Sequence, residues 1–373
     1  MIIVGEHMSK EKMKEEQALE NKCPSCNASI KFNPTLGKFK CEYCASEFTL
    51  EELKKYSNNA STDEKNKPVE EQVVDTYDGY ISYKCESCGA EIVTDEQTAA
   101  TFCVYCGNTA ILKSKLSGEF TPSRMIPFER EKQEAITAFK GLSKGRPLMP
   151  KDFNKESNIE KIKGVYIPFW LYDIGVSGDV NMTGNIITHW SRGDTHYTKT
   201  DTYRLLRGGK MVYNSIPVDG SSRFDNDIMN TLEPFHYEAL IPYNHAYLSG
   251  FYAEKYDEEG EKTYTEAKER AINSTRDYFS DDAKMYTAKV ITSDSLVAEE
   301  KQKEYVMLPV WMVNVKYKNK MHIFAMNGQT GEFIGNIPID TKRAILYATR
   351  VFLTSMVVFS LLSYLFFIMG VMD

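Results

Sequence analysis

The chain has 373 residues, of which 42% are hydrophobic and 26% charged, and its formal net charge is -7. This length allows two or three folded units with a sizeable core, and the composition is that of a folded protein rather than a disordered one. The acidic balance excludes a whole-protein positive field that would attract nucleic acid or an anionic membrane, although it leaves room for a local basic face.

The first twenty residues form a polar N-terminal segment. Their apolar run extends only from Met1 to Val4, and charged residues follow at once. A secretory signal peptide needs a longer apolar stretch, so we expect no signal peptide here.

The cysteines occur as one pattern used twice. Each copy reads CxxC, fourteen residues and a second CxxC, and the neighbouring residues repeat as well, as in CPSCNASI and CESCGAEI. The two sets are Cys23, Cys26, Cys41 and Cys44, and then Cys85, Cys88, Cys103 and Cys106. This repeat predicts two small β zinc ribbons of the rubredoxin-like type, at residues 21–50 and 81–113, joined by a polar linker at 51–80 that starts with a short helix.

Four thiolates at this spacing are typical of a tetrahedral zinc site. Each CxxC forms a tight knuckle, and the residues that follow are small or tolerate turns, namely Asn27, Ala45, Gly89 and Gly107. Since four protein ligands close the coordination sphere, we expect two structural Zn²⁺ ions and no catalytic metal.

Other interpretations of the cysteines fit less well. Disulfides are unfavourable in a reducing compartment, and a thioredoxin-like redox site has one CxxC in a βαβ unit rather than two pairs used twice. An iron site of the rubredoxin type uses the same ligands, so the spacing leaves zinc and iron both open.

Residues 118–340 are predicted to form a mixed α+β domain. Helical spacing marks Ala135, Ile136, Phe139 and Leu142, and then Ala267, Ala271, Ile272, Thr275 and Phe279. Between these helices we expect a strand at THYTKTDTYRLL, a turn at Gly208-Gly209 and a second strand at KMVYNSIPV, and we expect another hairpin at Asn327-Gly328.

This domain also shows a weak internal repeat. The segments 166–184 and 305–331 both follow a helical stretch, both carry Pro-x-Trp and both continue into alternating strands. The repeat indicates an internal duplication. Trp170 and Trp311 are then expected to be core anchors rather than ligand platforms.

No catalytic motif stands out. HExxH, GxSxG and GxGxxG are absent from the sequence. His189 and His196 lie near Asp194 and Asp201 in the strand-rich segment, where solvated sheet residues explain them better than a metal or acid-base site. We therefore expect no enzyme, no catalytic residue and no organic cofactor. We keep one alternative open for the central domain, namely that it binds a ligand or has an enzymatic activity that no motif reveals.

The C-terminal region predicts a membrane anchor. Residues 351–372 contain no charged residue and would span roughly 33 Å as a helix, enough for a bilayer core. Lys342, Arg343 and Arg350 precede this run and only Asp373 follows it, which places the N-terminal bulk in the cytoplasm. We expect one tail anchor at 344–372, in the cell membrane.

Several segments together resemble a known family. The paired ribbons, GVYIPFWLYD, the segment from Ile216 to Leu240, YLSGFYAEKY and FAMNGQTGEFIGNIPI are similar to bacterial TFIIB-type zinc-ribbon membrane proteins. Members of that family are often mislabelled as primosomal helicase-like, but this sequence has no helicase motor motif. The resemblance implies an adaptor role, with SPFH/flotillin-like or PspA-like protein partners in a membrane-stress system.

The sequence therefore favours a membrane-anchored cytoplasmic zinc-ribbon adaptor or scaffold that binds proteins through its ribbons. The alternative is a nucleic-acid-binding zinc-ribbon protein. The first ribbon offers a modest basic cluster of Lys22, Lys31, Lys38 and Lys40, whereas the second is acidic, which is the wrong sign for phosphate contact.

Overall fold

A computed structural model provides the fold. It describes residues 17–18, 21–60, 80–85, 88–95, 97–103, 108–116, 118–150, 161–224, 226–318 and 320–368. The described residues therefore leave out Cys106, most of the expected linker and nearly all of the expected N-terminal segment.

The first cysteine ribbon is a three-stranded antiparallel sheet. Its strands are β2 (Ile30–Asn33), β3 (Lys38–Cys41) and β4 (Glu47–Phe48), in the order β2-β3-β4. Alternate residues of β2 and β3 are buried, which gives the sheet one inward face. Helix α1 (Leu50–Ala60) follows directly, and a capping box between Thr49 and Glu52 fixes its start.

The second cysteine ribbon is divided between two sheets. Strands β5 (Tyr80–Cys85) and β6 (Glu91–Asp95) pair with each other, and β1 (Gln17–Ala18) lies parallel to β5. The next hairpin, β7 (Thr98–Phe102) and β8 (Thr109–Ile111), instead joins the large central sheet, because β7 pairs with β13 (Tyr252–Glu254).

The centre of the molecule is a twisted sheet of eleven strands within the described residues. Its longest members are β10 (Lys163–Arg192), β11 (Thr195–Asp219) and β15 (Val297–Tyr317), and β10 pairs antiparallel with both β11 and β15. Besides β7, β8 and β13, its other strands are β9 (Arg124–Met125), β12 (Ile241–Pro242), β14 (Thr287–Asp294), β16 (Lys320–Asn327) and β17 (Phe333–Gly335).

The helices of this domain cover the sheet only in part. Among the described residues they are α2 (Lys132–Gly141), α4 (Asn226–Thr231) and α5 (Gly260–Asp282), with short 3₁₀ turns at 113–116, 118–120, 237–239 and 245–248. The two helices predicted from spacing are confirmed, and Ala135, Phe139, Ala267, Ala271 and Phe279 are buried. The domain is nevertheless mostly β, not the even α+β mixture that we expected, because β10, β11 and β15 are far longer than ordinary strands.

Our prediction of a turn at Gly208-Gly209 is wrong. Strand β11 runs straight through both glycines, and the hairpin turns at Gly193, whose φ is +62°. Gly208 lies opposite Asp179 of β10, and a Cβ atom at this glycine would overlap the Asp179 carboxylate. The glycine therefore permits close approach within the sheet and does not form a turn.

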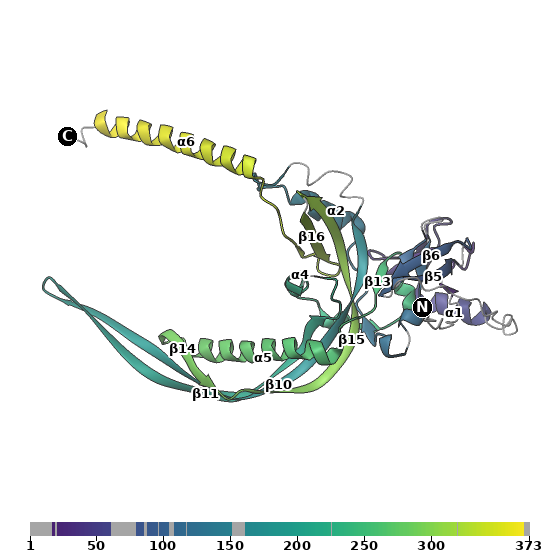
Figure 1. The fold of residues 1–373 in the computed structure, drawn as a ribbon, viewed down its shortest axis with the longest axis horizontal. Coiled ribbons are helices and arrows are strands. Elements are labelled where there is room, and N and C mark those ends of the chain that lie inside the picture. The colour runs from purple at the N-terminus through teal and green to yellow at the C-terminus, as the bar shows by residue number, and fades with distance from the viewer. Residues whose placement is uncertain are drawn as a thin grey trace, which may run out of the picture.

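Strands β10 and β11 extend as an arm beyond the body of the domain (Figure 1). Helix α5 lies along the concave side of this arm, where Val180, Met182 and Leu205 pack with Phe279 and Ala283. Beyond Asn185 the described strands form a two-stranded ribbon. Near its end the exposed Trp190 stacks on Tyr197 with ring centroids 5.4 Å apart.

The two repeated segments meet at the centre of the sheet. Ile167 pairs directly with Leu308, and the Pro-x-Trp motifs lie symmetrically on either side of this pair. Trp170 Nε1 donates a hydrogen bond to the carbonyl of Glu258, just before α5, and Trp311 Nε1 donates to the carbonyl of Arg130, just before α2. Each half therefore holds the helix start of the other half, which is the arrangement expected of a local twofold axis. Both tryptophans are core anchors, as predicted.

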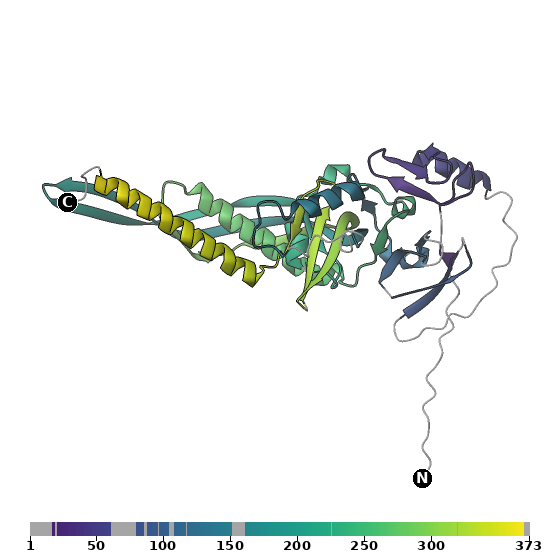
Figure 2. The same ribbon diagram turned by 90° about the horizontal axis from the view of Figure 1, so that it is seen from above.

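The last element is α6 (Thr341–Ile368), a long apolar helix. Residues 341–365 are long and apolar enough to cross a membrane, and none of that stretch is buried against the rest of the molecule. In both ribbon views α6 and the β10–β11 arm extend toward one side, whereas the cysteine ribbons lie at the opposite end (Figures 1 and 2).

Candidate metal centres and the docking of the ribbons

The first cysteine set forms a compact cluster. The four sulfur atoms of Cys23, Cys26, Cys41 and Cys44 lie within 4.8 Å of one another. The Cys23 and Cys44 sulfurs are 3.6 Å apart, and the Cys26 and Cys41 sulfurs are 3.5 Å apart. A disulfide would need about 2.05 Å, whereas a tetrahedral metal with bonds of about 2.3 Å to sulfur places the sulfurs about 3.8 Å apart. The geometry thus fits a bound metal ion and not a disulfide.

The backbone of each knuckle explains why these residue types occur there. In the first knuckle the amide of Asn27 donates to the carbonyl of Cys23 (2.8 Å) and the amide of Cys23 donates to the carbonyl of Ala28 (2.7 Å). The same two bonds occur around Cys41 and Cys85, and the matching bond from Cys103 to Asn108 is 2.9 Å. Asn27, Ala45 and Gly89 have φ of 61°, 59° and 73°, the left-handed region that glycine and asparagine tolerate best.

Crowding of the thiols creates a need for positive charge. Hydrogen bonds from the side chain and amide of Ser46 lower the pKa of Cys44 to about 6. For Cys26 the amide of Ala28 lowers the pKa, but burial and the neighbouring thiols outweigh it and raise the pKa to about 12. A cation at the centre would remove this conflict by allowing all four sulfurs to be thiolates.

The second set is grouped in the same way over its described members. The sulfurs of Cys85, Cys88 and Cys103 lie within 4.8 Å of one another, with Cys88 and Cys103 3.7 Å apart. Cys106, the fourth predicted ligand, lies outside the described residues. Of the eight predicted ligands the structure therefore brings together seven, in two groups that could each hold a metal ion.

The first ribbon is docked on the body of the molecule. Phe32 and Phe39 pack against Tyr247, with ring centroids 4.9 and 5.4 Å apart, and the amide of Phe32 donates to the carbonyl of Ser249 (3.1 Å). Cys23 and Cys41 belong to the same buried cluster as Tyr166 and Trp311 of the central sheet. The cysteine cluster and the central core are therefore contiguous.

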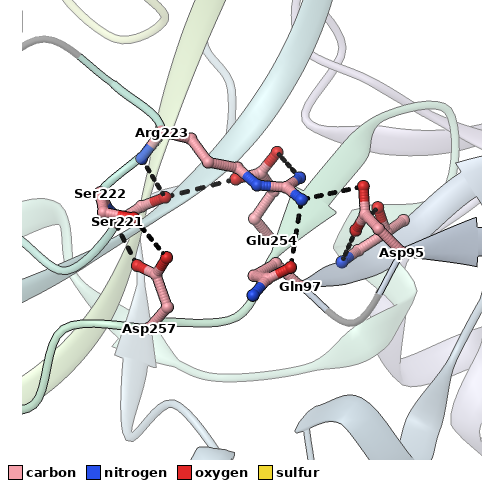
Figure 3. A network of polar contacts seen from close by, with 8 residues as sticks. Asp95, Gln97, Ser221, Ser222, Arg223, Glu254 and Asp257 are labelled. Atoms are coloured by element: carbon pink, nitrogen blue, oxygen red, sulfur yellow. Dashed lines mark hydrogen bonds and ion pairs between the residues drawn. The ribbon is translucent and has the colours of Figure 1, made fainter. Parts of the chain in front are cut away.

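The second ribbon is docked through Arg223 (Figure 3). The Arg223 guanidinium lies 2.9 Å from a carboxylate oxygen of Asp95 and 3.3 Å from one of Glu254, and it donates to Gln97 Oε1 at 3.1 Å. Burial raises the pKa of Glu254, which Arg223 opposes. For Asp95 burial also acts to raise the pKa, but hydrogen bonds from Thr98 and Arg223 outweigh it and the pKa is lowered. Arg223 therefore bridges a ribbon carboxylate and a carboxylate of the central sheet.

The two histidines of the strand-rich segment lie on the exposed part of the sheet. His189 contacts Thr198 and His196 contacts Ser191, and all four side chains are exposed. Asp219 is different, because it is 2% exposed and its Oδ1 has no hydrogen-bond partner among the described residues. Burial raises the pKa of Asp219 to about 7, with a further contribution from Glu266 and Glu258.

Comparison with known proteins gives one informative relative. The chain is 33% identical over 309 residues to the protein named YdjG of Bacillus subtilis (strain 168), and this match covers 70% of the chain and 91% of the relative. The chain belongs to the YdjG family. No family model and no solved structure matches it.

Sequence reasoning missed several residues that organise this YdjG-family chain. Arg223 and Tyr247 hold the two ribbons, yet each lies far along the chain from the residue that it contacts. Their only sequence signal is the presence of an arginine and an aromatic residue in an irregular segment. Ser46 could have been noticed, because a hydroxyl two residues after a cysteine is well placed to bond its sulfur.

Proposed function

We propose that this YdjG-family protein is a membrane-anchored cytoplasmic scaffold whose two zinc-loaded ribbons bind a protein partner. The observation that carries the proposal is the polarity of the molecule. Helix α6 starts near α2 and extends with its apolar surface exposed toward one side of the molecule, and both ribbons lie on the opposite side (Figures 1 and 2). If α6 inserts into a bilayer, the ribbons project toward the aqueous phase, where a partner can reach them.

The metal in this proposal is zinc. Zn²⁺ in structural sites is bound by four ligands in a tetrahedron, and thiolates are common ligands for it. Because four cysteines complete the coordination sphere, the ion would be structural. Cys23, Cys26, Cys41 and Cys44 would hold one ion, and Cys85, Cys88, Cys103 and Cys106 the other. Each ion would neutralise thiolates and hold a small module together.

The ribbon surface offers a contact point for proteins. Tyr43 lies inside the second knuckle of the first ribbon and is 85% exposed. Exposed aromatic side chains contribute strongly at protein interfaces, because they bury a large area with few rotatable bonds. Lys31, part of the basic cluster of this ribbon, pairs with Glu42 at 2.7 Å, which reduces the charge available for nucleic acid. The resemblance to TFIIB-type membrane proteins points to SPFH- or PspA-like partners.

The test is capture of partners from membranes. The full chain would be crosslinked in its native membrane and purified, and the captured proteins compared between wild type and Tyr43→Ser. We expect at least one partner to be reduced several-fold by this substitution, because the tyrosine is exposed and its loss leaves the metal ligands untouched. Tyr278→Ser is the matched control, since Tyr278 is 58% exposed on α5, away from the ribbons.

Two results would contradict the proposal. One is a wild-type protein that alkaline carbonate removes from the membrane, which would show that α6 is not an anchor. The other is a set of captured proteins that Tyr43→Ser and Tyr278→Ser leave equally unchanged, which would remove the first ribbon as the binding surface.

A further inference from the structure

A cavity of about 670 Å³ lies where α6 leaves the central domain. One wall is the loop after α2, with Arg146 and Met149, and the other is the first part of α6, with Arg343, Leu346, Tyr347 and Arg350. The α6 residues are spaced by three or four positions, so they lie on one face of the helix. Three guanidinium groups therefore line one cavity that also has an apolar wall. None of the described residues lining it is acidic.

The cavity is held open by specific bonds and is not a loose gap between two elements. Arg343 donates to the carbonyls of Pro147 and Met149, and the amide of Asp340 donates to the carbonyl of Leu148 at 2.9 Å. The Asp340 carboxylate accepts from the amide of Lys342 at 2.9 Å and caps the start of α6. These bonds tie the loop to the start of α6, so that Arg146 and Arg350 line the cavity from opposite walls.

The position of the cavity along α6 suggests what it binds. Arg350 is the last charged residue before the apolar run of residues 351–368. It lies seven positions after Arg343, or about 10 Å along the helix axis. A bilayer has a headgroup layer of roughly 5 to 8 Å on each side of its hydrocarbon core. If the apolar run fills the core, the cavity lies at headgroup depth, with its arginines beside lipid phosphates and its apolar wall beside the acyl chains.

We infer that this cavity binds the phosphate of an anionic phospholipid, held between Arg146 and Arg350, with Arg343 fixing the loop. Guanidinium groups bind phosphate oxygens in pairs of parallel hydrogen bonds, and basic pockets beside membrane helices are typical sites for lipid headgroups. This inference rests on the membrane anchor in the proposed function. It adds a specific lipid contact that would fix the orientation of the domain on the membrane.

The test titrates phosphatidylglycerol into the full-length protein in detergent micelles and measures binding by native mass spectrometry. Arg146→Gln and Arg350→Gln should each weaken binding about tenfold, as expected for loss of a charge-assisted hydrogen bond. Lys342→Gln is the matched control, because it removes a charge from the first turn of the same helix without lining the cavity, and it should change binding less than twofold. Phosphatidylcholine with the same acyl chains should bind weakly and equally to all variants.

Three outcomes would overturn the inference. They are unchanged phosphatidylglycerol binding in Arg146→Gln and Arg350→Gln, equal weakening by Lys342→Gln, and displacement of the lipid by inorganic phosphate at the same concentration. The third would make the cavity a site for soluble anions. Arg350→Gln alters an exposed side chain of α6, so misfolding would not obscure its result.

The experiments also distinguish failure of the membrane anchor from failure of the lipid site. A wild-type chain that is not integral in vesicles would contradict the proposed function and this site together. An integral chain with unaltered lipid binding in the arginine variants would contradict only the site.

Discussion

At the scale of single residues, the molecule contains ionisable groups whose environment alters their chemistry. Asp219 ends strand β11 in a buried position, and Arg223 lies between two carboxylates from separate modules. Both residues are ionisable groups at partly or fully buried positions. Their effect on stability depends on whether the desolvation penalty of the charged form exceeds the stabilisation from an oppositely charged partner.

Asp219 predicts a pH dependence of stability. The pKa of its carboxyl is raised to about 7 in the folded chain, while an unfolded aspartate titrates near 4. Between these values the folded state holds a proton that the unfolded state has lost, so the free energy of unfolding falls as pH rises from about 4 to about 7. Asp219→Asn should remove this loss and stabilise the protein at pH 8 by roughly 2 to 4 kcal/mol.

Urea unfolding of the full chain in micelles at pH 4.5 and pH 8 measures this effect. Asp281→Asn, an exposed position on α5, is the control and should change stability by less than about 0.5 kcal/mol at either pH. A gain at pH 8 no larger than that of the control would show that Asp219 ionises normally.

Arg223→Met should undock the second ribbon. The substitution keeps an apolar stem but leaves Asp95 and the largely buried Glu254 without their shared cation, at a cost of about 2 kcal/mol for partly buried groups. Hydrogen exchange in β7 should increase markedly, because the pairing of β7 with β13 is short. Arg204→Met on the exposed arm is the comparison, and equal exchange in both variants would argue against the bridging role.

At the scale of elements, the main finding is that the two repeated halves hold each other. Trp311 donates to the carbonyl before α2, although 181 positions separate the two residues, and Trp170 does the same before α5. Each accepting carbonyl belongs to the residue just before a helix N-cap, so the crossed pair of indole hydrogen bonds positions both helix starts against one sheet.

Trp311→Phe should therefore destabilise the protein by about 1 to 2 kcal/mol, from one lost, partly buried hydrogen bond plus some loss of packing. Its local signature is faster hydrogen exchange in the first turn of α2, with α5 unaffected. Trp190→Phe is the control, since Trp190 is 47% exposed at the end of the arm. Uniformly faster exchange in both helices would show a general loss of core packing instead.

At the scale of the whole molecule, the candidate metal centres and the central core form one structure. Cys23 and Cys41 lie in the same buried cluster as residues of the central sheet, so the first ribbon cannot open without exposing part of that core. This arrangement differs from that of independent ribbons on a flexible linker, and it couples metal binding to the stability of the domain.

Metal removal tests this coupling. Elemental analysis of the purified chain should give about two zinc ions per chain, and Cys26→Ser should reduce this to about one. A chelator should lower the melting temperature of the central domain by several degrees, because the loss of a structural ion releases the ribbon side of the core. Iron in place of zinc would correct the identity of the metal, and an unchanged melting temperature would show that the ribbons are energetically separate.

The features that the sequence predicted are those that depend on residues close to one another along the chain, such as a helix or a cysteine knuckle. The spacing of the cysteines predicted the two groups in which the seven described thiols lie. Asn27 and Gly89 were correctly predicted to be turn residues, since both have a positive φ. Periodicity located α2 and α5, and uniform apolarity located α6. In each case a short-range geometric requirement fixes the residue type, so the pattern can be recognised without knowing what it packs against.

Only the tertiary structure decided the rest. Gly208-Gly209 has the pattern of a turn, but its role depends on the close approach of Asp179 from another strand. The length of β10 and β11, the docking of the ribbons and the arginine-lined cavity all depend on contacts between residues that are distant in sequence. Such contacts leave no periodic signal, because any suitably placed arginine, aromatic residue or glycine satisfies them. The sequence therefore determined the modules of this protein, and the packing of side chains between modules determined how they are joined.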